Sequence, residues 1–498
     1  MKKQQQYRLG KSLGLILIWL GLQLGVKQKE VFAQTATLLT AVDESKDTSV
    51  CVADIEPAIA EIINRSNLRR SRWGILVQTL DTQETLYALA AERHFIPASN
   101  TKLLTTAAVL TQLGTDFRIR TPFYATGTVP NLITLRVVGK GDPSLTTAKL
   151  RAVAQQLKQA GVEEIEQLIV QDGYFSESPI LASWEWEDVY AYYGVAVNSL
   201  ILDENAVVLT LLPQQLGQPV KVNWSNSLAA RQWQVENTAV TAAEGTPYGV
   251  TIDGVLGERR LKIAGELAAD AGADIWGLAI RNPAEYFLAS LRTALILEGI
   301  EVQESAVTTT PETTSWGEAI AVIESPSLEV LIKDTNQPSN NLYAEALLRT
   351  LGVEKNSSGI AATEDSLTAL GVDSAGYLLK DGSGLSRHNL VSPQAIVQTL
   401  SGIAKTPLGE IYRNSLPLAG VNGTLRRRFQ NTPLQGQLRA KTGTVTGTSA
   451  LSGYLESDHF PPLVFSILIN QSDQSVSSQR EAIDEIVLLL SRLQSCQN

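Results

Sequence analysis

The two ends of the chain carry matching patterns of expected elements, and this feature constrains the fold most strongly. Near the amino end, apolar residues alternate over 73–80 and 84–90, which predicts two strands, and they take helical spacing over 103–113. Near the carboxyl end, strands are expected over 449–455 and 463–470, followed by an amphipathic helix. Helices that flank an antiparallel sheet fit an α+β domain made from both ends of the chain.

A large insertion is expected between these ends. Short β segments dominate residues 205–265, and a helix-like run over 283–298 closes the segment. We therefore expect an inserted domain over 118–305, with a nested β-rich subdomain at about 205–265. This insertion would divide the outer domain into two parts, 47–117 and 306–498.

The amino terminus indicates where the protein works. Basic residues precede an apolar run over 13–26, and Val31-Phe32-Ala33 offers a site suited to cleavage by a signal peptidase. The run is shorter than the roughly 20 residues of a spanning helix, so we expect residues 1–33 to be a signal peptide. The mature protein would then be periplasmic or otherwise extracytoplasmic. Charged residues just before the cleavage site keep a retained anchor open, and with it peripheral association with a membrane.

Cys51 and Cys496, the only cysteines, lie near the two ends of the mature chain. Cysteines of an exported protein can be oxidised, and chain termini are often neighbours in space. A disulfide that closes the ends and a pair of solitary thiols both fit the sequence. In either case, the sequence gives little support to cysteine-based catalysis.

Charge and histidine content exclude other classes of function. Acidic residues number 51 and basic residues 41, for a net charge of −10, which argues against a nucleic-acid partner because such partners need a clustered basic face. His94, His388 and His459 are too scattered for a metal site. We therefore expect an exported enzyme with no metal and no cofactor.

Ser99 and Lys102 form the first candidate for chemistry. Ser99 comes at the expected start of a helix, and a lysine three residues later lies on the same helix face within reach of it. The pair supplies a nucleophile and a base, provided that burial or nearby positive charge lowers the pKa of the lysine. Taken alone, a helix-capping serine and a solvated lysine explain the pattern equally well.

Two further motifs favour the catalytic interpretation of Ser99 and Lys102. Lys441-Thr442-Gly443-Thr444 begins the carboxyl-terminal strands, where the lysine could bind a substrate carboxylate and the glycine would let a substrate backbone approach the strand edge. Ser339-Asn340-Asn341 opens another helix and supplies a hydroxyl and a carboxamide. Each alone fits a surface lysine or a helix cap. Together and in this order, S-x-x-K, S-x-N and K-T-G form the set found in penicillin-recognising serine enzymes.

At these motifs the chain resembles the D-alanyl-D-alanine carboxypeptidase/endopeptidases, class C of the low-molecular-mass penicillin-binding proteins. Further segments that carry the likeness are Gly139–Ser144, Trp184–Asp188, Asp203–Asn205, Asp381–Arg387 and Gly423–Leu425. The resemblance implies a transpeptidase/β-lactamase-like catalytic domain, with a five-stranded antiparallel sheet flanked by helices, which a large insertion interrupts. Asn340 stands where many relatives carry Asp.

The resemblance also implies an activity. It is that of a serine-type D-Ala-D-Ala carboxypeptidase or endopeptidase, which acts on peptidoglycan stem peptides through an acyl-enzyme and which β-lactam antibiotics inhibit. Ser99 would attack the carbonyl of the penultimate D-Ala, Lys102 would take its proton, and Ser339 would relay that proton to the leaving nitrogen. The backbone N–H groups of Ser99 and Thr444 would form the oxyanion hole. The substrate-binding residues would be Asn341, Lys441, Thr442, Gly443 and Thr444.

Asp172 and Arg387 resemble family residues near the pocket for the stem-peptide side chain. A carboxylate and a guanidinium together could bind the ammonium and the carboxylate of a diaminopimelate centre. A turn-forming aspartate and a solvated arginine are the alternatives.

Two other classes of function stay open. The same motifs would serve a β-lactamase or an esterase, although the large insertion disfavours both. A non-catalytic sensor of cell-wall peptide or β-lactam is the second, and the complete set of motif residues argues against it. The sequence leaves the oligomeric state open.

Overall fold

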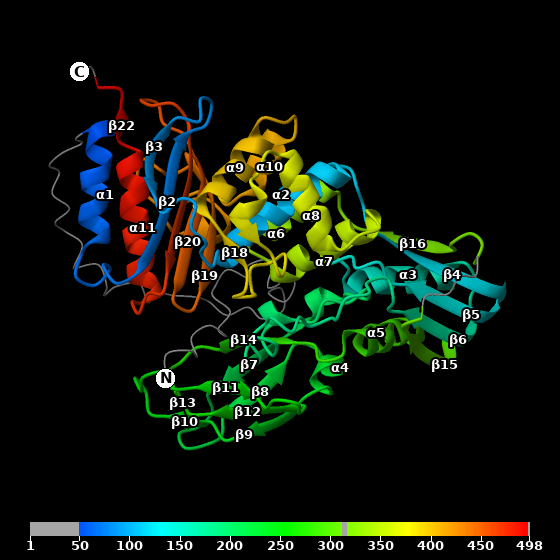
Figure 1. Cartoon of the computed structure of the whole chain (residues 1–498). Coiled ribbons are helices and arrows are strands. Elements are labelled where there is room, and N and C mark those ends of the chain that lie inside the picture. The colour runs from blue at the N-terminus through cyan, green and yellow to red at the C-terminus, as the bar shows by residue number, and fades with distance from the viewer. Residues whose placement is uncertain (1–48, 311–315, 497–498) are drawn as a thin grey trace.

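A computed structural model describes residues 49–310 and 316–496, so the expected signal peptide, residues 1–33, lies outside the described residues. A five-stranded sheet in the order β19-β20-β21-β2-β3 joins the two ends of the chain (Figure 1). Its strands are β2 (Arg72–Thr79), β3 (Thr85–Leu89), β19 (Leu438–Val445), β20 (Thr448–Leu455) and β21 (Leu463–Asn470). All neighbouring strands run antiparallel, which confirms the predicted sheet.

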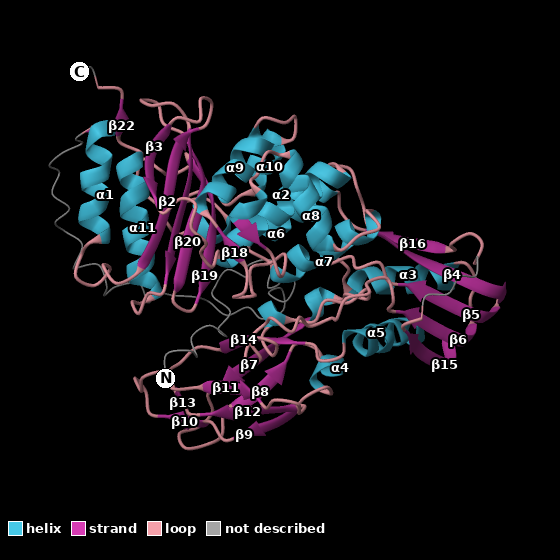
Figure 2. Cartoon of the chain, viewed as in Figure 1, coloured by secondary structure: helices cyan, strands magenta, loops and turns pink. Residues whose placement is uncertain are grey.

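Helices cover both faces of this sheet (Figure 2). On one face, α1 (Ile55–Ile63) and α11 (Val476–Leu490) bury isoleucines such as Ile59 and Ile483 against the strands. The other face carries a larger group: α2 (Thr101–Leu113), α6 (Leu328–Asn336), α7 (Asn341–Glu354), α8 (Gly359–Ala369), α9 (Pro393–Ala404) and α10 (Gly409–Ser415). The expected α+β architecture is confirmed.

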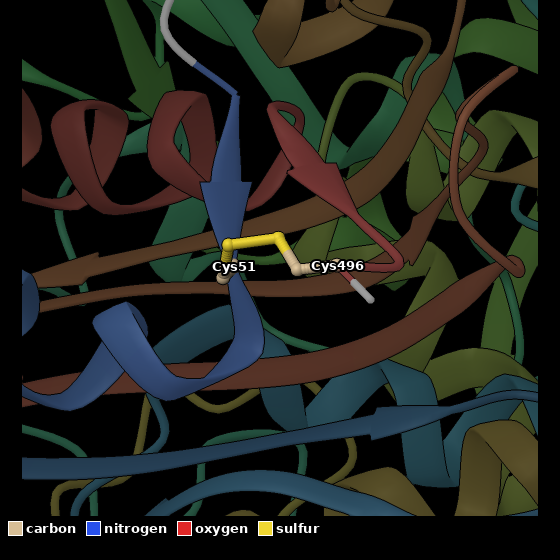
Figure 3. Close-up of a disulfide and its surroundings, with 2 residues drawn as sticks. All are labelled: Cys51 and Cys496. Atoms are coloured by element: carbon tan, nitrogen blue, oxygen red, sulfur yellow. A yellow bond between two sulfur atoms is a disulfide. The ribbon is translucent and has the colours of Figure 1, made fainter. Parts of the chain in front are cut away.

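The chain termini of the described structure meet beside α1 and α11. Strand β1 (Val50–Cys51) pairs in parallel with β22 (Leu493–Gln494). Cys51 and Cys496 form a disulfide across this pair (Figure 3). The alternative of two solitary thiols is therefore wrong.

The middle of the chain forms a second five-stranded sheet in the order β15-β6-β5-β4-β16. Its strands are β4 (Arg120–Thr128), β5 (Asn131–Val138), β6 (Glu164–Gln171), β15 (Glu301–Thr308) and β16 (Ala321–Glu324), and α3 (Thr147–Gln159) and α5 (Pro283–Leu297) pack with it. Strand β16 pairs with β4 although it follows the expected boundary at residue 305. The domain boundaries themselves stay a prediction.

Short strands fill most of the remaining segment. They form the sheets β14-β7-β8 and β11-β12-β9 and the pair β10-β13. Their bounds are β7 (Ala206–Leu212), β8 (Lys221–Trp224), β9 (Gln234–Asn237), β10 (Val240–Ala242), β11 (Thr251–Gly254), β12 (Arg260–Ala264), β13 (Glu266–Ala268) and β14 (Asp274–Ala279), with the short helix α4 (Ser227–Ala230) between β8 and β9.

One small apolar cluster brings this middle segment against the outer helices. Trp184, Val197 and Ile201 pack with Leu342 of α7 and with Leu385. The contact fixes the inserted residues beside the two segments that carry the second motif and the 381–387 loop. In the described part of the chain, no helix is both long and apolar enough to cross a bilayer.

Candidate active site

Ser99 lies in a strained turn that leads into α2. The turn is the short helix η4 (Ala98–Asn100), in which the buried Ala98 has a φ of +48°. The loop that contains Gly384 packs directly on this turn, because a Cβ at Gly384 would lie 1.9 Å from the Ala98 carbonyl oxygen. Gly384 also has a φ of +81°, so only glycine fits this contact.

Lys102 lies one helical turn after Ser99, and its side chain is fully buried. Its Nζ is 3.1 Å from Ser99 Oγ, 2.6 Å from Asn341 Oδ1 and 2.6 Å from the carbonyl oxygen of Ser383. These three contacts join the first motif to the second motif and to the 381–387 loop. The loop thus closes over the lysine that the sequence paired with Ser99.

The environment of Lys102 suits a base. Burial lowers its pKa to about 7, and the negative charges of Asp381 and Glu345 only partly oppose this effect. Glu345 is also fully buried, and burial raises its pKa to about 7. A neutral lysine amine within hydrogen-bond distance of a serine hydroxyl can accept its proton.

The second motif begins α7. Asn340 caps this helix, since its Oδ1 accepts a hydrogen bond from the Tyr343 backbone N–H at 3.2 Å. Ser339, just before the cap, has a φ of +65°. This backbone conformation directs Ser339 Oγ to within 2.8 Å of Lys441 Nζ, so the second and third motifs meet.

The third motif lies on β19, the edge strand of the sheet. Lys441 is fully buried, and burial, followed by the positive charge of Lys102, holds its pKa well below the usual range. Thr444, farther along β19, accepts a hydrogen bond from Arg480 Nη2 at 3.2 Å. Because an edge strand has unpaired backbone groups on its outer side, β19 can bind an extended substrate.

These elements enclose a cavity of about 330 Å³. Five predicted residues line it: Ser99, Ser339, Asn341, Arg387 and Thr444. Lys102 and Lys441 are in direct contact with the two serines of the cavity wall. The three motifs, which are far apart in the sequence, therefore form one site.

Besides Lys102 and Lys441, three other predicted residues do not line this cavity: Asp172, Thr442 and Gly443. Asp172 accepts hydrogen bonds from Asn198 Nδ2 at 3.0 Å and from the Ser199 backbone N–H at 2.7 Å, so its carboxylate holds a neighbouring loop. Thr442 Oγ1 donates to Thr424 Oγ1 at 2.8 Å.

Gly443 packs against the protein itself. A Cβ at this position would lie 2.7 Å from the Pro97 carbonyl oxygen. The glycine therefore makes room for the turn before Ser99, and the expected close approach of a substrate backbone at Gly443 stays a prediction.

Arg387 faces acidic residues that the sequence reasoning did not select. Its Nε is 3.8 Å from Glu185 Oε1, and its Nη2 donates to the carbonyl oxygen of Thr446 at 2.9 Å. Asp188 also lines the cavity and accepts a hydrogen bond from the Tyr193 hydroxyl at 3.1 Å. Both acids belong to the Trp184–Asp188 segment. The likeness of this segment to the family is the sequence feature that could have identified them.

Asp381 is a further residue that was not predicted from the sequence as a contributor to the site. Its fully buried carboxylate accepts hydrogen bonds from the backbone N–H groups of Gly384 and Ser386 at 2.7 and 2.6 Å. It also accepts from Trp184 Nε1 at 2.9 Å and from Asn389 Nδ2 at 2.7 Å. Asp381 thereby fixes the loop that contacts Lys102 and carries Arg387.

Comparisons with known proteins agree with this geometry. The family model described as D-Ala-D-Ala carboxypeptidase 3 (S13) matches residues 55–493. The chain is 31% identical over 456 residues to a D-alanyl-D-alanine carboxypeptidase of Actinomadura sp. (strain R39), covering 87% of this chain and 84% of that protein. It is 29% identical to a penicillin-sensitive carboxypeptidase A of Dictyostelium discoideum, over 88% of this chain and 92% of that one.

A solved structure is also similar. The crystal structure of penicillin binding protein 4 from Haemophilus influenzae superposes with a TM-score of 0.76 at 25% identity, covering 89% of this chain and 98% of that one. Given this likeness and the convergence of three motifs on one cavity, the chain belongs to the D-Ala-D-Ala carboxypeptidase 3 (S13) family and is a serine-type carboxypeptidase.

Proposed function

We propose that Ser99 is the nucleophile that cleaves the D-Ala-D-Ala bond and that Lys102 is its general base. The observation that carries this proposal is the 3.1 Å contact between Ser99 Oγ and Lys102 Nζ, made by a fully buried lysine whose pKa is lowered to about 7. Lys102 accepts the hydroxyl proton while Ser99 Oγ bonds to the carbonyl carbon of the penultimate D-Ala. The tetrahedral oxyanion is stabilised by the backbone N–H groups of Ser99 and Thr444.

The proton then reaches the leaving group through the second motif. Ser339 Oγ, positioned by a hydrogen bond from Lys441 Nζ at 2.8 Å, donates its proton to the leaving nitrogen as the peptide bond breaks and takes up the proton held by Lys102, so Lys102 becomes neutral again. Terminal D-Ala departs as an amine and the acyl group stays on Ser99. Water, deprotonated by Lys102, attacks this ester, which releases the shortened peptide and returns the proton to Ser99.

The terminal carboxylate of the substrate is held by the third motif. Thr444 and Arg480 supply a hydroxyl and a guanidinium at one end of the cavity, Lys441 adds a donor from behind Ser339, and Asn341 hydrogen-bonds the substrate amide. A bound carboxylate would also raise the pKa of Lys441 toward its usual range, because opposite charge favours the ammonium form. In a cross-linked substrate the leaving group is another stem peptide. The site would accept it if this peptide could extend past the Thr444 and Arg480 end of the cavity.

We further propose peptidoglycan stem peptides as the substrate, outside the cytoplasm and in the periplasm where one exists. Membership of a D-Ala-D-Ala carboxypeptidase family supports the substrate, and the Cys51–Cys496 disulfide supports an oxidising compartment. Glu185 and Asp188, opposite Arg387, would take the place first expected for Asp172. Together they can bind the ammonium and carboxylate groups at the end of a diaminopimelate side chain.

The pH dependence of acylation tests the assignment of Lys102. Lys102 acts as a base only when neutral, so kcat/KM for release of D-Ala is expected to rise with pH and to level off above an inflection near pH 7. Free D-Ala is measured with a diaminopimelate-containing pentapeptide between pH 5 and 9, with Ser99→Ala as the inactive control. A rate that is flat across this range, or that falls on passing pH 7, would contradict the assignment.

Replacing Arg387 with alanine tests the selectivity of the cavity. We expect kcat/KM to fall by about 10-fold or more for a pentapeptide with diaminopimelate, since a charge-assisted contact to a carboxylate contributes about 1.5–3 kcal/mol. A peptide with an uncharged side chain at the same position is the control, and its kcat/KM should change little. Equal losses for the two peptides would remove Arg387 from side-chain recognition.

A further inference from the structure

A second cavity lies beside the catalytic one. It has a volume of about 350 Å³, and Tyr192 lines both cavities. Its walls come from the residues before α3, from β7, from α5 and α7, and from the short helix η6 (Asp203–Asn205). Apolar side chains such as Leu145 and Val207 form part of the lining.

The charge in this second cavity is entirely negative. Asp203 and Glu204 line it, and no lysine or arginine is among its lining residues in the described part of the chain. Both carboxylate oxygens of Asp203 already accept hydrogen bonds, from Thr147 and from the Tyr286 hydroxyl. Lys149, a nearby cation, is held outside the lining by Ser144 and Asp142.

Glu204 has one carboxylate oxygen available to bind a ligand. One carboxylate oxygen accepts a hydrogen bond from Asn340 Nδ2 at 2.8 Å, and no residue of the described chain donates to the other. Burial raises the pKa of Glu204, and the negative charges of Asp334 and Asp203 add to this effect. A cation beside this carboxylate would relieve the unfavourable burial of its charge.

Tyrosines complete the lining. Tyr192, Tyr286 and Tyr343 all border the cavity. Tyr343 is only 7% exposed, yet among the described residues its hydroxyl has no hydrogen-bond partner, and the same holds for the hydroxyl of Tyr192. Aromatic faces attract ammonium groups, and free phenol oxygens can accept hydrogen bonds from them.

We propose that this second cavity binds a primary ammonium group carried on a short apolar chain, with Glu204 as its counter-ion and the tyrosines around it. The carboxylate and the phenol oxygens satisfy the three N–H donors, while Leu145 and Val207 contact the carbon chain. The proposal goes beyond peptide-bond cleavage at Ser99 and depends on none of its steps. A lysine-like side chain of a peptide and a free alkylamine share this chemistry.

The geometry also couples the second cavity to the catalytic motifs. Asp203, Glu204 and Asn205 have φ values of +49°, +57° and +50°, a strained run that holds the Glu204 side chain against Asn340. Asn340 lies between the motif residues Ser339 and Asn341. A ligand that draws Glu204 away from Asn340 therefore acts on the second motif.

Calorimetric titration of the full mature chain with n-pentylamine tests the proposal. Pentylammonium is expected to bind at one site, whereas 1-pentanol and pentanoate of the same length should bind at least 10-fold more weakly. Glu204→Gln keeps an acceptor for Asn340 but removes the charge, and should weaken pentylammonium at least 10-fold. Glu163→Gln, which neutralises an exposed acid that lines neither cavity, should leave this affinity unchanged. Nα-acetyl-lysine amide, compared with pentylamine, distinguishes a peptide ligand from a free amine.

The opposite pattern would overturn the proposal. Equal affinity for the ammonium and the alcohol, or full affinity in Glu204→Gln, would show that the carboxylate is not the counter-ion. Loss of binding in Glu185→Gln alone would assign the amine to the catalytic cavity. Tyr343→Phe removes only an unpartnered hydroxyl and should fold normally, so a several-fold loss of affinity in this variant supports the site independently. None of these outcomes depends on whether Ser99 is the nucleophile.

Discussion

Replacing Lys102 with methionine is expected to lower kcat/KM for release of D-Ala by about 10²- to 10⁴-fold, the range that a general base contributes. Methionine fills a similar volume but cannot accept the proton of Ser99, which lies 3.1 Å from Lys102 Nζ. Substrate binding should change little, because Lys102 lies behind the cavity wall. The effect should therefore appear in kcat and in the rate of acylation by a β-lactam, measured by stopped-flow mixing.

The control for this variant is Lys405→Met, which changes an exposed lysine at the end of α9. Far-UV circular dichroism and thermal unfolding establish that both proteins are folded. If Lys102→Met retained more than about a tenth of the wild-type acylation rate in a folded protein, another group would have to act as the base.

Replacing Lys441 with methionine is expected to lower kcat/KM by about 10²- to 10³-fold, as for the loss of one preorganised electrostatic donor. The variant removes the contact to Ser339 Oγ at 2.8 Å and one of the donors proposed to hold the substrate carboxylate. Both the relay to the leaving nitrogen and the binding of the carboxylate are affected, so KM should rise as kcat falls.

A comparison of two substrates separates these roles. A peptide whose terminal carboxylate is replaced by an amide already lacks the charge that Lys441 would bind. For this peptide the fall in kcat/KM caused by Lys441→Met should be smaller than for the acid. If kcat/KM fell equally for the acid and for the amide, Lys441 would position Ser339 but would not bind the carboxylate.

Local sequence patterns were sufficient to predict four strands of the sheet and to pick out the three motifs, whereas the five-stranded sheet was implied by the family resemblance. The strands at both ends of the chain alternate clearly, and their helices carry long apolar faces, so propensity and packing favour the same structure. Ser99 and Lys102 are also one helical turn apart, which fixes their proximity without any long-range information. The family resemblance then explained the long interval between Ser99 and Ser339 as an insertion.

The roles of other residues depend on contacts that no local pattern records. Asp172 was expected in the cavity, but Asn198 and Ser199, from a different loop, take up its carboxylate. Gly443 has the spacing of a substrate-binding strand, yet the Pro97 carbonyl occupies the space above it. Both positions are decided by backbone segments that are remote in the sequence.

Contacts between segments that are remote in the sequence also explain why other features of the site were not predicted. Lys102 has a lowered pKa because the 381–387 loop and α7 bury it, and the spacing of the motif contains no information on burial. Arg480 reaches Thr444 from the last helix, where a single arginine is not distinctive. Glu185 and Asp188 were recognisable only as part of a segment with family likeness.

Intact-protein mass spectrometry of the mature chain with benzylpenicillin tests the central claim, a covalent acyl-enzyme on Ser99, most directly. We predict a stable adduct with the mass of one benzylpenicillin, located on the peptide that contains Ser99 and absent from Ser99→Ala. No adduct on the folded protein would contradict the claim and favour a sensor, and an adduct on another residue would contradict it as well. Penicilloate that accumulates without a lasting adduct would instead identify a β-lactamase.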